Sequence, residues 1–189
     1  LDVPNRKWSD RILEILEIPK EWMPEVYESP VVSGKVSHAA AQLTGLKMDT
    51  PVVGGGGDQA AGAVGNGIVK AGLISSTIGT SGVVFAHMDS VSIDPKGRVH
   101  TFCHAIPGAW HVMGVTQGAG LSLQWMRNNF GGMEREIARF MEVDPYDLMV
   151  KEAEQAAPGC HGLIYLPYLM GERTPHLDPN ARGVFFGLT

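Results

Sequence analysis

The chain has 189 residues, of which 44% are hydrophobic, so it can bury a core as one large domain or as parts of two. Its net charge of -5 argues against a broad nucleic-acid-binding surface. Its two cysteines, Cys103 and Cys160, are too few for a disulfide scaffold and fit no metal-binding spacing. This usage favours free thiols in a reducing, cytoplasmic compartment.

Two long runs, residues 71–88 and 99–126, contain no Asp, Glu, Lys or Arg. Their glycine, hydroxyl, histidine and proline residues are atypical of membrane helices, and the runs instead favour strands buried on both faces. We therefore expect no membrane partner. The chain starts at Leu1 without the basic segment of a signal peptide, and residues 183–189 look like an unfinished strand, so we expect a piece of a longer chain.

Short elements separated by proline and glycine are predicted in the first part of the chain. Ser9 is typical of a helix-capping residue, and the apolar residues after it predict a helix that ends before Pro19. Further elements are expected as a strand over 30–32, a helix over 35–43 closed by Gly45, a strand over 51–53 and a small-residue helix over 58–69.

Strands and helices follow one another from residue 70 onward. Two hairpins are predicted, from strands over 73–78 and 83–88 and from strands over 99–105 and 110–115, with a turn over 94–97 between them. Helices are expected over 120–130, stopped by two glycines, and from Asp144 to before Pro158; residues 163–169 and 184 onward read as extended. This succession predicts an α/β fold with a mixed sheet and flanking helices.

Four consecutive glycines followed by an acid, residues 54–58, are the most informative motif. Glycine lets another backbone or a ligand come close, and a helix start favours negative charge. Asp58 is therefore either a helix cap or a proton acceptor for a hydroxyl group in a tight corner. A dinucleotide fingerprint is formally present from Gly55 to Ala60. It is rejected because Asp58 would repel the pyrophosphate and no acid follows about 20 residues later.

A second glycine motif, Gly79-Thr80-Ser81-Gly82, joins the two strands of the first predicted hairpin. Taken alone, it is a plain hairpin turn more often than a phosphate-binding loop, because glycine and serine dominate turns. Backbone N–H groups and hydroxyls at such a turn also suit a phosphate. An acid on one glycine corner followed by this turn favours phosphoryl transfer, with one element for the acceptor hydroxyl and one for the donor phosphates.

These motifs resemble the FGGY family of carbohydrate kinases. The resemblance covers residues 55–63 and 79–82, then the segment 171–189 with its Gly-Glu-Arg-Thr-Pro-His start and its Arg-Gly-Val-Phe-Phe-Gly-Leu-Thr end. The segments 8–10, 102–105 and 110–113 are most similar to the subgroup that phosphorylates D-xylulose, the xylulokinases.

The resemblance implies an actin-like ATPase fold of two ribonuclease-H-like domains, with residues 1–48 ending the N-terminal domain and 49–189 forming the first half of the C-terminal domain. It implies transfer of the ATP γ-phosphoryl group to a primary hydroxyl of a ketose or polyol, with Mg²⁺. In this reading Asp58 is the general base and binds the acceptor together with Gln59. The nucleotide contacts are then Gly79, Thr80, Ser81, Gly120 and Gln124.

Several alternatives stay open beside this reading. Many xylulokinases have Asn where this chain has Gln59, and glycerol kinases have Gln, so glycerol, ribulose and gluconate remain candidate acceptors. A non-catalytic nucleotide- or sugar-binding module of the actin-like superfamily is a further alternative, as is a solvated helix face for Gln124. The resemblance leaves a homodimer open. It places the first phosphate loop, the Mg²⁺-binding acid and the adenine site outside this chain, so we expect the chain alone to be inactive.

Two other groups of residues have competing interpretations. His100, His104 and His111 lie on the second predicted hairpin, where a metal site is conceivable. No clear set of acids or thiols completes it, so ordinary strand histidines are favoured and no metal ligand is assigned. Glu172 and Arg173 either clamp a phosphate or sugar or brace a loop as an ion pair, and the brace is favoured.

Overall fold

The computed structural model describes residues 1–189, which divide into two compact units. Unit 1 comprises Leu1–Ser75 and Phe85–Met113, and unit 2 comprises Ser76–Val84 and Gly114–Thr189. None of the helices combines the length and the hydrophobicity that crossing a bilayer requires.

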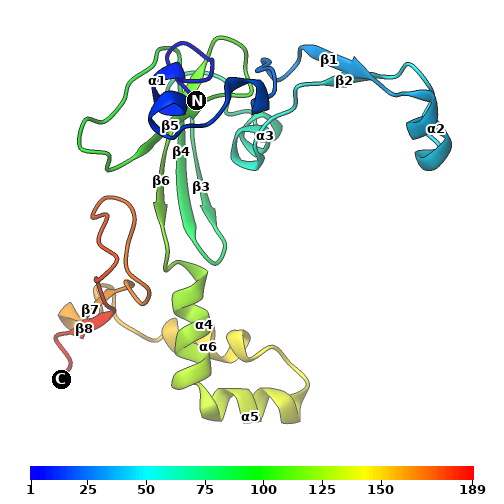
Figure 1. Ribbon diagram of the computed structural model, residues 1–189. Coiled ribbons are helices and arrows are strands. Elements are labelled where there is room, and N and C mark those ends of the chain that lie inside the picture. Colours follow the sequence, from blue (N-terminus) through cyan, green and yellow to red (C-terminus); the bar gives the residue numbers. More distant parts are fainter. The chain divides into compact units, whose positions relative to one another are not determined.

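Unit 1 begins with short elements whose ends follow the local sequence. They are α1 (Asp10–Ile15), a 3₁₀ turn (Lys20–Trp22), β1 (Val32–Lys35), α2 (His38–Thr44), β2 (Pro51–Val53) and α3 (Asp58–Gly65) (Figure 1). The Ser9 hydroxyl accepts a hydrogen bond from the Ile12 N–H at 3.3 Å, and Gly45 ends α2 with a φ of 75°. The predicted caps are confirmed.

Three elements of unit 1 differ from the predicted ranges. The helix expected over 35–43 is α2, which begins only at His38, because Lys35 still belongs to β1. The strand expected over 30–32 is β1, which starts at Val32 and pairs antiparallel with β2, from Val32 opposite Val53 to Lys35 opposite Pro51. The helix expected over 58–69 ends at Gly65. It stops because Asn66 closes the last turn and Gly67 turns the chain with a φ of 75°, a conformation that glycine adopts without strain.

A four-stranded sheet follows, formed by β3 (Ile74–Ile78), β4 (Gly82–Met88), β5 (His100–Cys103) and β6 (Trp110–Thr116) in the order β3-β4-β6-β5. Both predicted hairpins are confirmed, and β5 pairs antiparallel with β6, with Phe102 opposite His111. The turn predicted over 94–97 is also confirmed, since the Gly97 N–H donates to the Asp94 carbonyl oxygen at 2.9 Å.

Phe85 is the centre of the core of unit 1, with 1% of its surface exposed. Ala63, Ile68 and Leu73 pack with it. The rings of His104 and His111 also lie against Phe85, with centroids 5.3 Å and 4.3 Å away. His104 and His111 are therefore part of the interior of this unit.

Polar and aromatic contacts tie the first residues of the chain to β6. The guanidinium of Arg6 donates to the Glu28 carboxylate at 2.8 Å and to the Ala109 carbonyl oxygen at 2.7 Å. The same guanidinium lies 4.2 Å from the ring centroid of Trp110, whose indole N–H donates to the Val3 carbonyl oxygen at 3.1 Å. A planar cation suits this combination of hydrogen bonds and stacking.

Besides the tip of the β3–β4 hairpin and the end of β6, unit 2 contains three helices and a strand pair, which are labelled in Figure 1. These are α4 (Gly120–Asn129), α5 (Gly132–Met141), α6 (Pro145–Ala153), a 3₁₀ turn (Cys160–Gly162), β7 (Ile164–Leu166) and β8 (Val184–Phe186). The predicted helices correspond to α4 and α6, and Asp144 caps α6 by accepting from the Tyr146 N–H at 2.9 Å. Strands β7 and β8 pair antiparallel, and the rings of Tyr165 and Phe185 stack with centroids 4.6 Å apart.

Helix α5 was not predicted, because Gly131 and Gly132 were interpreted only as a stop. Gly131 ends α4, and its N–H donates to the Met126 carbonyl oxygen. A Cβ at Gly131 would lie 3.0 Å from the Arg127 carbonyl oxygen, so the bend needs a residue without a side chain. Gly132 then starts α5 at once. Two adjacent glycines here separate two helices.

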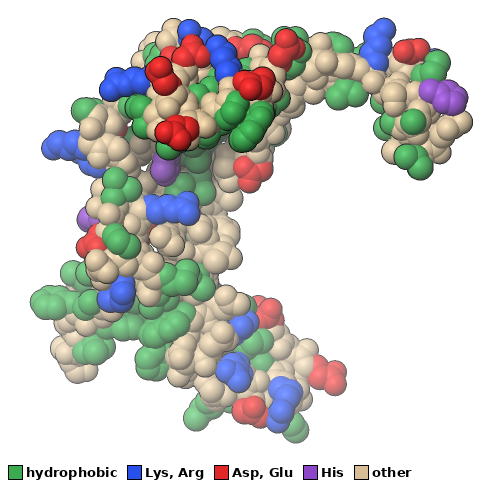
Figure 2. All heavy atoms as spheres, viewed as in Figure 1, with side chains coloured by type: hydrophobic (Ala, Val, Ile, Leu, Met, Phe, Trp, Pro, Cys, Tyr) green, Lys and Arg blue, Asp and Glu red, His purple; other side chains and the backbone are tan.

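Large apolar side chains remain exposed in both units. The most exposed include Leu43 at 88%, Ile78 at 78% and Phe140 at 90%. Figure 2 shows hydrophobic side chains at the surface of the segment that contains β1, β2 and α2, and again over β7 and β8. Apolar surface of this extent is typical of faces that contact another part of a protein or a partner.

Candidate active site

The glycine run before Asp58 forms a corner where side chains would collide with other backbone. A Cβ at Gly54 would lie 2.8 Å from the Glu28 carbonyl oxygen, and a Cβ at Gly56 would lie 3.3 Å from the Ala105 Cβ. Gly55 has a φ of 75°. Close approach and a left-handed turn therefore explain three of the four glycines.

Asp58 is the first residue of α3, and Gly57 is the residue that caps the helix. The interpretation of Asp58 as the cap is therefore wrong. One carboxylate oxygen of Asp58 accepts the N–H of Gln59 at 2.8 Å, while the other has no partner in the chain. The exposed side chain lines a cavity of about 270 Å³ together with Gln59, His111, Cys103, Phe102 and Met113. The structure thus places the two predicted acceptor contacts, Asp58 and Gln59, in one cavity.

His111 is a member of this cavity that the sequence analysis did not assign to the site. It lies on β6, and 4% of its surface is exposed. The sequence contained only a weak signal for this position of His111. It predicted the hairpin on which His111 lies, but not which face of that hairpin is turned towards Asp58. The three hairpin histidines form no metal site, since no group of three or more His, Cys, Asp or Glu side chains is placed to hold an ion.

The second glycine motif is tied to the start of α4 within unit 2. The N–H of Gly120 donates to the Gly79 carbonyl oxygen at 2.8 Å, and the N–H groups of Ala119 and Leu121 donate to the Thr80 carbonyl oxygen, each at 3.2 Å. The backbone N–H groups and hydroxyls of Thr80 and Ser81 have no acceptor or donor within the chain. Unpaired N–H groups and hydroxyls at a tight turn are suited to a phosphate.

Two glycines allow this close approach. A Cβ at Gly82 would lie 2.8 Å from the Thr116 methyl carbon, and a Cβ at Gly120 would lie 2.5 Å from the Gly79 carbonyl oxygen. Gln124 is exposed one turn further along α4, and its side chain makes no hydrogen bond. The structure therefore brings four of the five predicted nucleotide residues together, in unit 2, whereas Asp58 belongs to unit 1.

Glu172 supports the same region from the far end of the chain. Its buried carboxylate accepts hydrogen bonds from the Thr116 hydroxyl at 2.6 Å, from the Gln117 N–H at 3.0 Å and from the Arg173 N–H at 2.7 Å. The predicted brace is confirmed, but the predicted ion pair is wrong, because the exposed Arg173 side chain forms no salt bridge. The Glu172 carboxylate is buried beside these backbone N–H groups and the Thr116 hydroxyl, and it therefore bonds to them instead of to the exposed Arg173 side chain.

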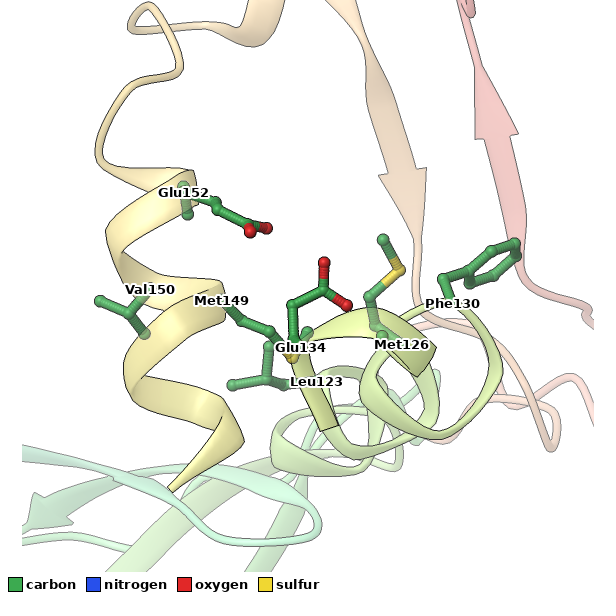
Figure 3. Close-up of a pocket in the computed structure, with 9 residues that line it drawn as sticks. Leu123, Met126, Phe130, Glu134, Met149, Val150 and Glu152 are labelled. Carbon is green, nitrogen blue, oxygen red and sulfur yellow. The ribbon is translucent and has the colours of Figure 1, made fainter. Parts of the chain in front are cut away.

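Helices α4, α5 and α6 enclose a second cavity, of about 320 Å³, that the sequence gave no sign of. Its walls are largely apolar, with Leu123 and Met126 from α4, Phe130 directly after α4, and Met149 and Val150 from α6 (Figure 3). Figure 3 shows the carboxylates of Glu134 and Glu152 directed into the space between the helices. One oxygen of Glu134 is buried without a hydrogen-bond partner.

Comparisons with known proteins show which family has these features. A family model described as the N-terminal domain of the FGGY family of carbohydrate kinases matches residues 1–65, and the model of the C-terminal domain matches residues 74–189. The chain is 40% identical over 189 residues to a xylulose kinase of Escherichia coli (strain K12), covering 100% of this chain and 37% of that protein. It is 35% identical over 183 residues to a gluconokinase of Bacillus licheniformis, covering 96% of this chain and 35% of that protein.

The fold matches as well as the sequence. The crystal structure of a xyloylose kinase from Brucella ovis superposes with a TM-score of 0.83 at 35% identity, covering 100% of this chain and 37% of that one. The chain therefore spans little more than a third of the length of the relatives it matches. Its mixed α/β architecture is the actin-like ATPase fold of these kinases, and the chain belongs to the FGGY family of carbohydrate kinases.

Proposed function

We propose that the full-length protein transfers the γ-phosphoryl group of ATP to a primary hydroxyl of a ketopentose, with D-xylulose as the first candidate. The observation on which this depends is the Asp58 carboxylate, which lines a cavity and keeps one oxygen without a partner. The 40% identity to a xylulose kinase over the whole chain supports D-xylulose. In this proposal, residues 1–48 are the end of the N-terminal domain of the full-length protein, and residues 49–189 are the first half of its C-terminal domain.

Asp58 acts as the general base in the proposed reaction. The acceptor hydroxyl donates a hydrogen bond to the free carboxylate oxygen. Asp58 takes the proton as the new O–P bond forms and the bond from the γ-phosphorus to the bridging oxygen breaks, with ADP as the leaving group. The hydrogen bond from the Gln59 N–H holds the other oxygen, which fixes the orientation of the carboxylate. Gln59 also lines the cavity, where its amide can bind a second hydroxyl of the acceptor.

Thr80 and Ser81 are proposed to bind the ATP phosphates through their unpaired N–H groups and hydroxyls, with Gly79 and Gly120 shaping the turn. Gln124 is proposed as a further nucleotide contact. The carboxylates of this chain do not fit a Mg²⁺ site, since no group of three or more ligating side chains is placed to hold an ion, so Mg²⁺ is proposed only as the partner of ATP. A homodimer and a cytoplasmic location stay predictions.

Asp58→Asn in the full-length protein tests the proposal. The amide keeps the shape of the carboxylate but cannot accept the proton, so kcat should fall by about 10² to 10⁴ while the affinity for ATP stays within about threefold. Asp49→Asn is the matched control, since Asp49 is exposed in the same unit and has a positive φ that asparagine also adopts. Near-normal turnover in Asp58→Asn would refute the role of the base.

A panel of acceptors tests the substrate. D-xylulose, D-ribulose, gluconate and glycerol are each offered with ATP and Mg²⁺ to the full-length protein. Gluconate is the second candidate because a gluconokinase is 35% identical to the chain. If D-xylulose is not the acceptor with the highest kcat/KM, the ketopentose assignment is wrong even where a kinase activity remains. The chain of residues 1–189 alone should have no measurable turnover.

A further inference from the structure

His111 is held in a fixed orientation in the wall of the Asp58 cavity. Its ring stacks on Phe85 with the centroids 4.3 Å apart and the planes 21° apart. The ring of Phe102 lies on it with a centroid distance of 5.5 Å and an angle of 28°. Two aromatic rings thus restrict the imidazole, and only 4% of the His111 surface is exposed.

The ring nitrogens of His111 have no hydrogen-bond partner within the chain. Its Nδ1 is fully enclosed without a partner, and its Nε2, which is not enclosed, forms no hydrogen bond either. The neighbouring His104 shows the usual situation: its Nε2–H donates to the Ile68 carbonyl oxygen at 3.2 Å, and its Nδ1 accepts the Ile106 N–H at 3.0 Å. Buried polar groups are normally paired, so an unpaired imidazole beside a cavity points to a ligand.

The charge state of His111 indicates which ligand chemistry fits. Burial, together with the neighbouring His104, lowers the pKa of His111 to about 4, so the ring is neutral near pH 7. A neutral imidazole has one donor and one acceptor nitrogen. A hydroxyl group matches this, because it also both donates and accepts, whereas an anion could use only the donor nitrogen.

The other walls of the cavity agree with a polyhydroxylated ligand. Asp58 and Gln59 supply an acceptor and an amide, while Phe102 and Met113 supply apolar surface. A sugar offers hydroxyls in several directions and C–H groups between them. The volume of about 270 Å³ leaves room for a small molecule of this kind.

We infer that His111 binds a non-reacting hydroxyl of the acceptor and thereby helps to select the sugar, while Asp58 addresses the hydroxyl that is phosphorylated. This inference rests on the proposed function. His111 is then a specificity-determining residue, and its removal should affect binding of the acceptor far more than the chemical step.

His111→Phe in the full-length protein is the test, because phenylalanine keeps the ring and its stacking but removes both nitrogens. The KM for the acceptor should rise about 3- to 10-fold, the range expected for one lost hydrogen bond, with kcat and the KM for ATP within about twofold. His111→Gln, which offers an amide in the place of Nε2, should recover part of the loss. His100→Phe is the matched control, since His100 lies on β5 but does not line the cavity.

Deoxy analogues of the acceptor identify the hydroxyl. The ratio of KM values between His111→Phe and the unchanged protein should approach one for the analogue that lacks the contacted hydroxyl and stay high for the others. A ratio near one for the parent acceptor overturns the inference, as does an equal loss with every analogue. If His111→Phe does not fold, the analogues are compared between His111→Gln and the unchanged protein, with the same outcomes deciding.

Calorimetric titration with the acceptor separates failure of this inference from failure of the proposed function. Equal binding by the unchanged protein and His111→Phe, with turnover intact, overturns the role of His111 and leaves the kinase proposal standing. If the unchanged protein neither binds nor phosphorylates any of the sugars and polyols, the kinase proposal is overturned, and the role of His111 with it.

Discussion

Replacing Glu172 with alanine should loosen the region around the second glycine motif. Glu172 is 4% exposed, and its carboxylate accepts three hydrogen bonds, from the Thr116 hydroxyl and from the N–H groups of Gln117 and Arg173. Thr116 and Gln117 lead directly into α4, whose first N–H groups donate to Gly79 and Thr80. Removal of the carboxylate thus leaves three donors without their acceptor at the base of the proposed phosphate-binding turn.

The expected magnitude follows from these three bonds. A hydrogen bond to a charged group contributes about 1.5–3 kcal/mol, and a buried donor without an acceptor costs a similar amount. The three do not add fully, because the Thr116 hydroxyl can rotate and water can enter the space that the side chain leaves. We expect Glu172→Ala to destabilise unit 2 by about 3–5 kcal/mol.

Glu172→Gln separates the charge from the shape. The N–H groups of Gln117 and Arg173 both donate to the same oxygen, Oε1, which the glutamine carbonyl oxygen can replace. The glutamine NH₂ then faces the Thr116 hydroxyl, which can accept instead of donate. This variant keeps all three contacts without the charge and should lose only about 1–2 kcal/mol.

Hydrogen exchange of the full-length protein measures the effect where it arises. In Glu172→Ala the N–H groups of Gln117 and Arg173 should exchange about 10- to 100-fold faster, and the KM for ATP should rise more than the KM for the acceptor. Glu136→Ala is the control, since Glu136 makes only an exposed ion pair with Arg139. Unchanged exchange in Glu172→Ala, or equal damage from the glutamine variant, would refute the reasoning.

Three further predictions concern other contacts. Gly120→Ala places a Cβ 2.5 Å from a backbone oxygen, so it should lower the free energy of unfolding by about 1–3 kcal/mol and raise the KM for ATP. Gly132→Ala is the control, because a Cβ there meets open space and should change neither quantity. Melting curves and initial rates measure both variants, and equal behaviour of the two would contradict the prediction. The lowered pKa of His111, due to burial and His104, means that the unfolded chain binds a proton between pH 6.5 and about 4 that the folded chain does not. Stability should therefore fall as the pH drops through this range, and less steeply in His111→Phe; equal slopes in urea unfolding would contradict this. Arg6→Lys loses the planar group that bonds and stacks in unit 1 and should cost about 1–2 kcal/mol, measured by the same unfolding curves, and no change would mean that these contacts are not stabilising.

Helix caps and tight turns were predicted from the sequence because their causes lie within a few residues. Ser9 starts one helix and Gly45 ends another where expected, and the two hairpins turn where glycine, proline and polar residues interrupt apolar runs. The helix over 58–69 was predicted too long because the terminating turn at Asn66 and Gly67 was overlooked. The missed α5 has the same origin, since two glycines end one helix without preventing the next.

In the Asp58 cavity, too, only the residues that are neighbours in the sequence were predicted. Asp58 and Gln59 were predicted as acceptor contacts because the glycine corner and the acid are adjacent in the sequence, and they line one cavity. His111 was not predicted, because α3 and β6 are more than fifty residues apart in the chain and only the folded structure brings residues of both to one cavity. No local pattern distinguishes an imidazole that lines a cavity from one that is buried in a core.

By itself the sequence determined where the backbone bends and which residues start and end its helices, since these depend on φ preferences and on hydrogen bonds between near neighbours. It also determined the family, through motifs spread along the whole chain. Only the tertiary structure decided which side chains share a cavity or an acceptor, as Glu172 shows by bonding to Thr116 and Gln117. Such contacts are set by the packing of distant segments, and that packing depends on the shapes of all the side chains between them.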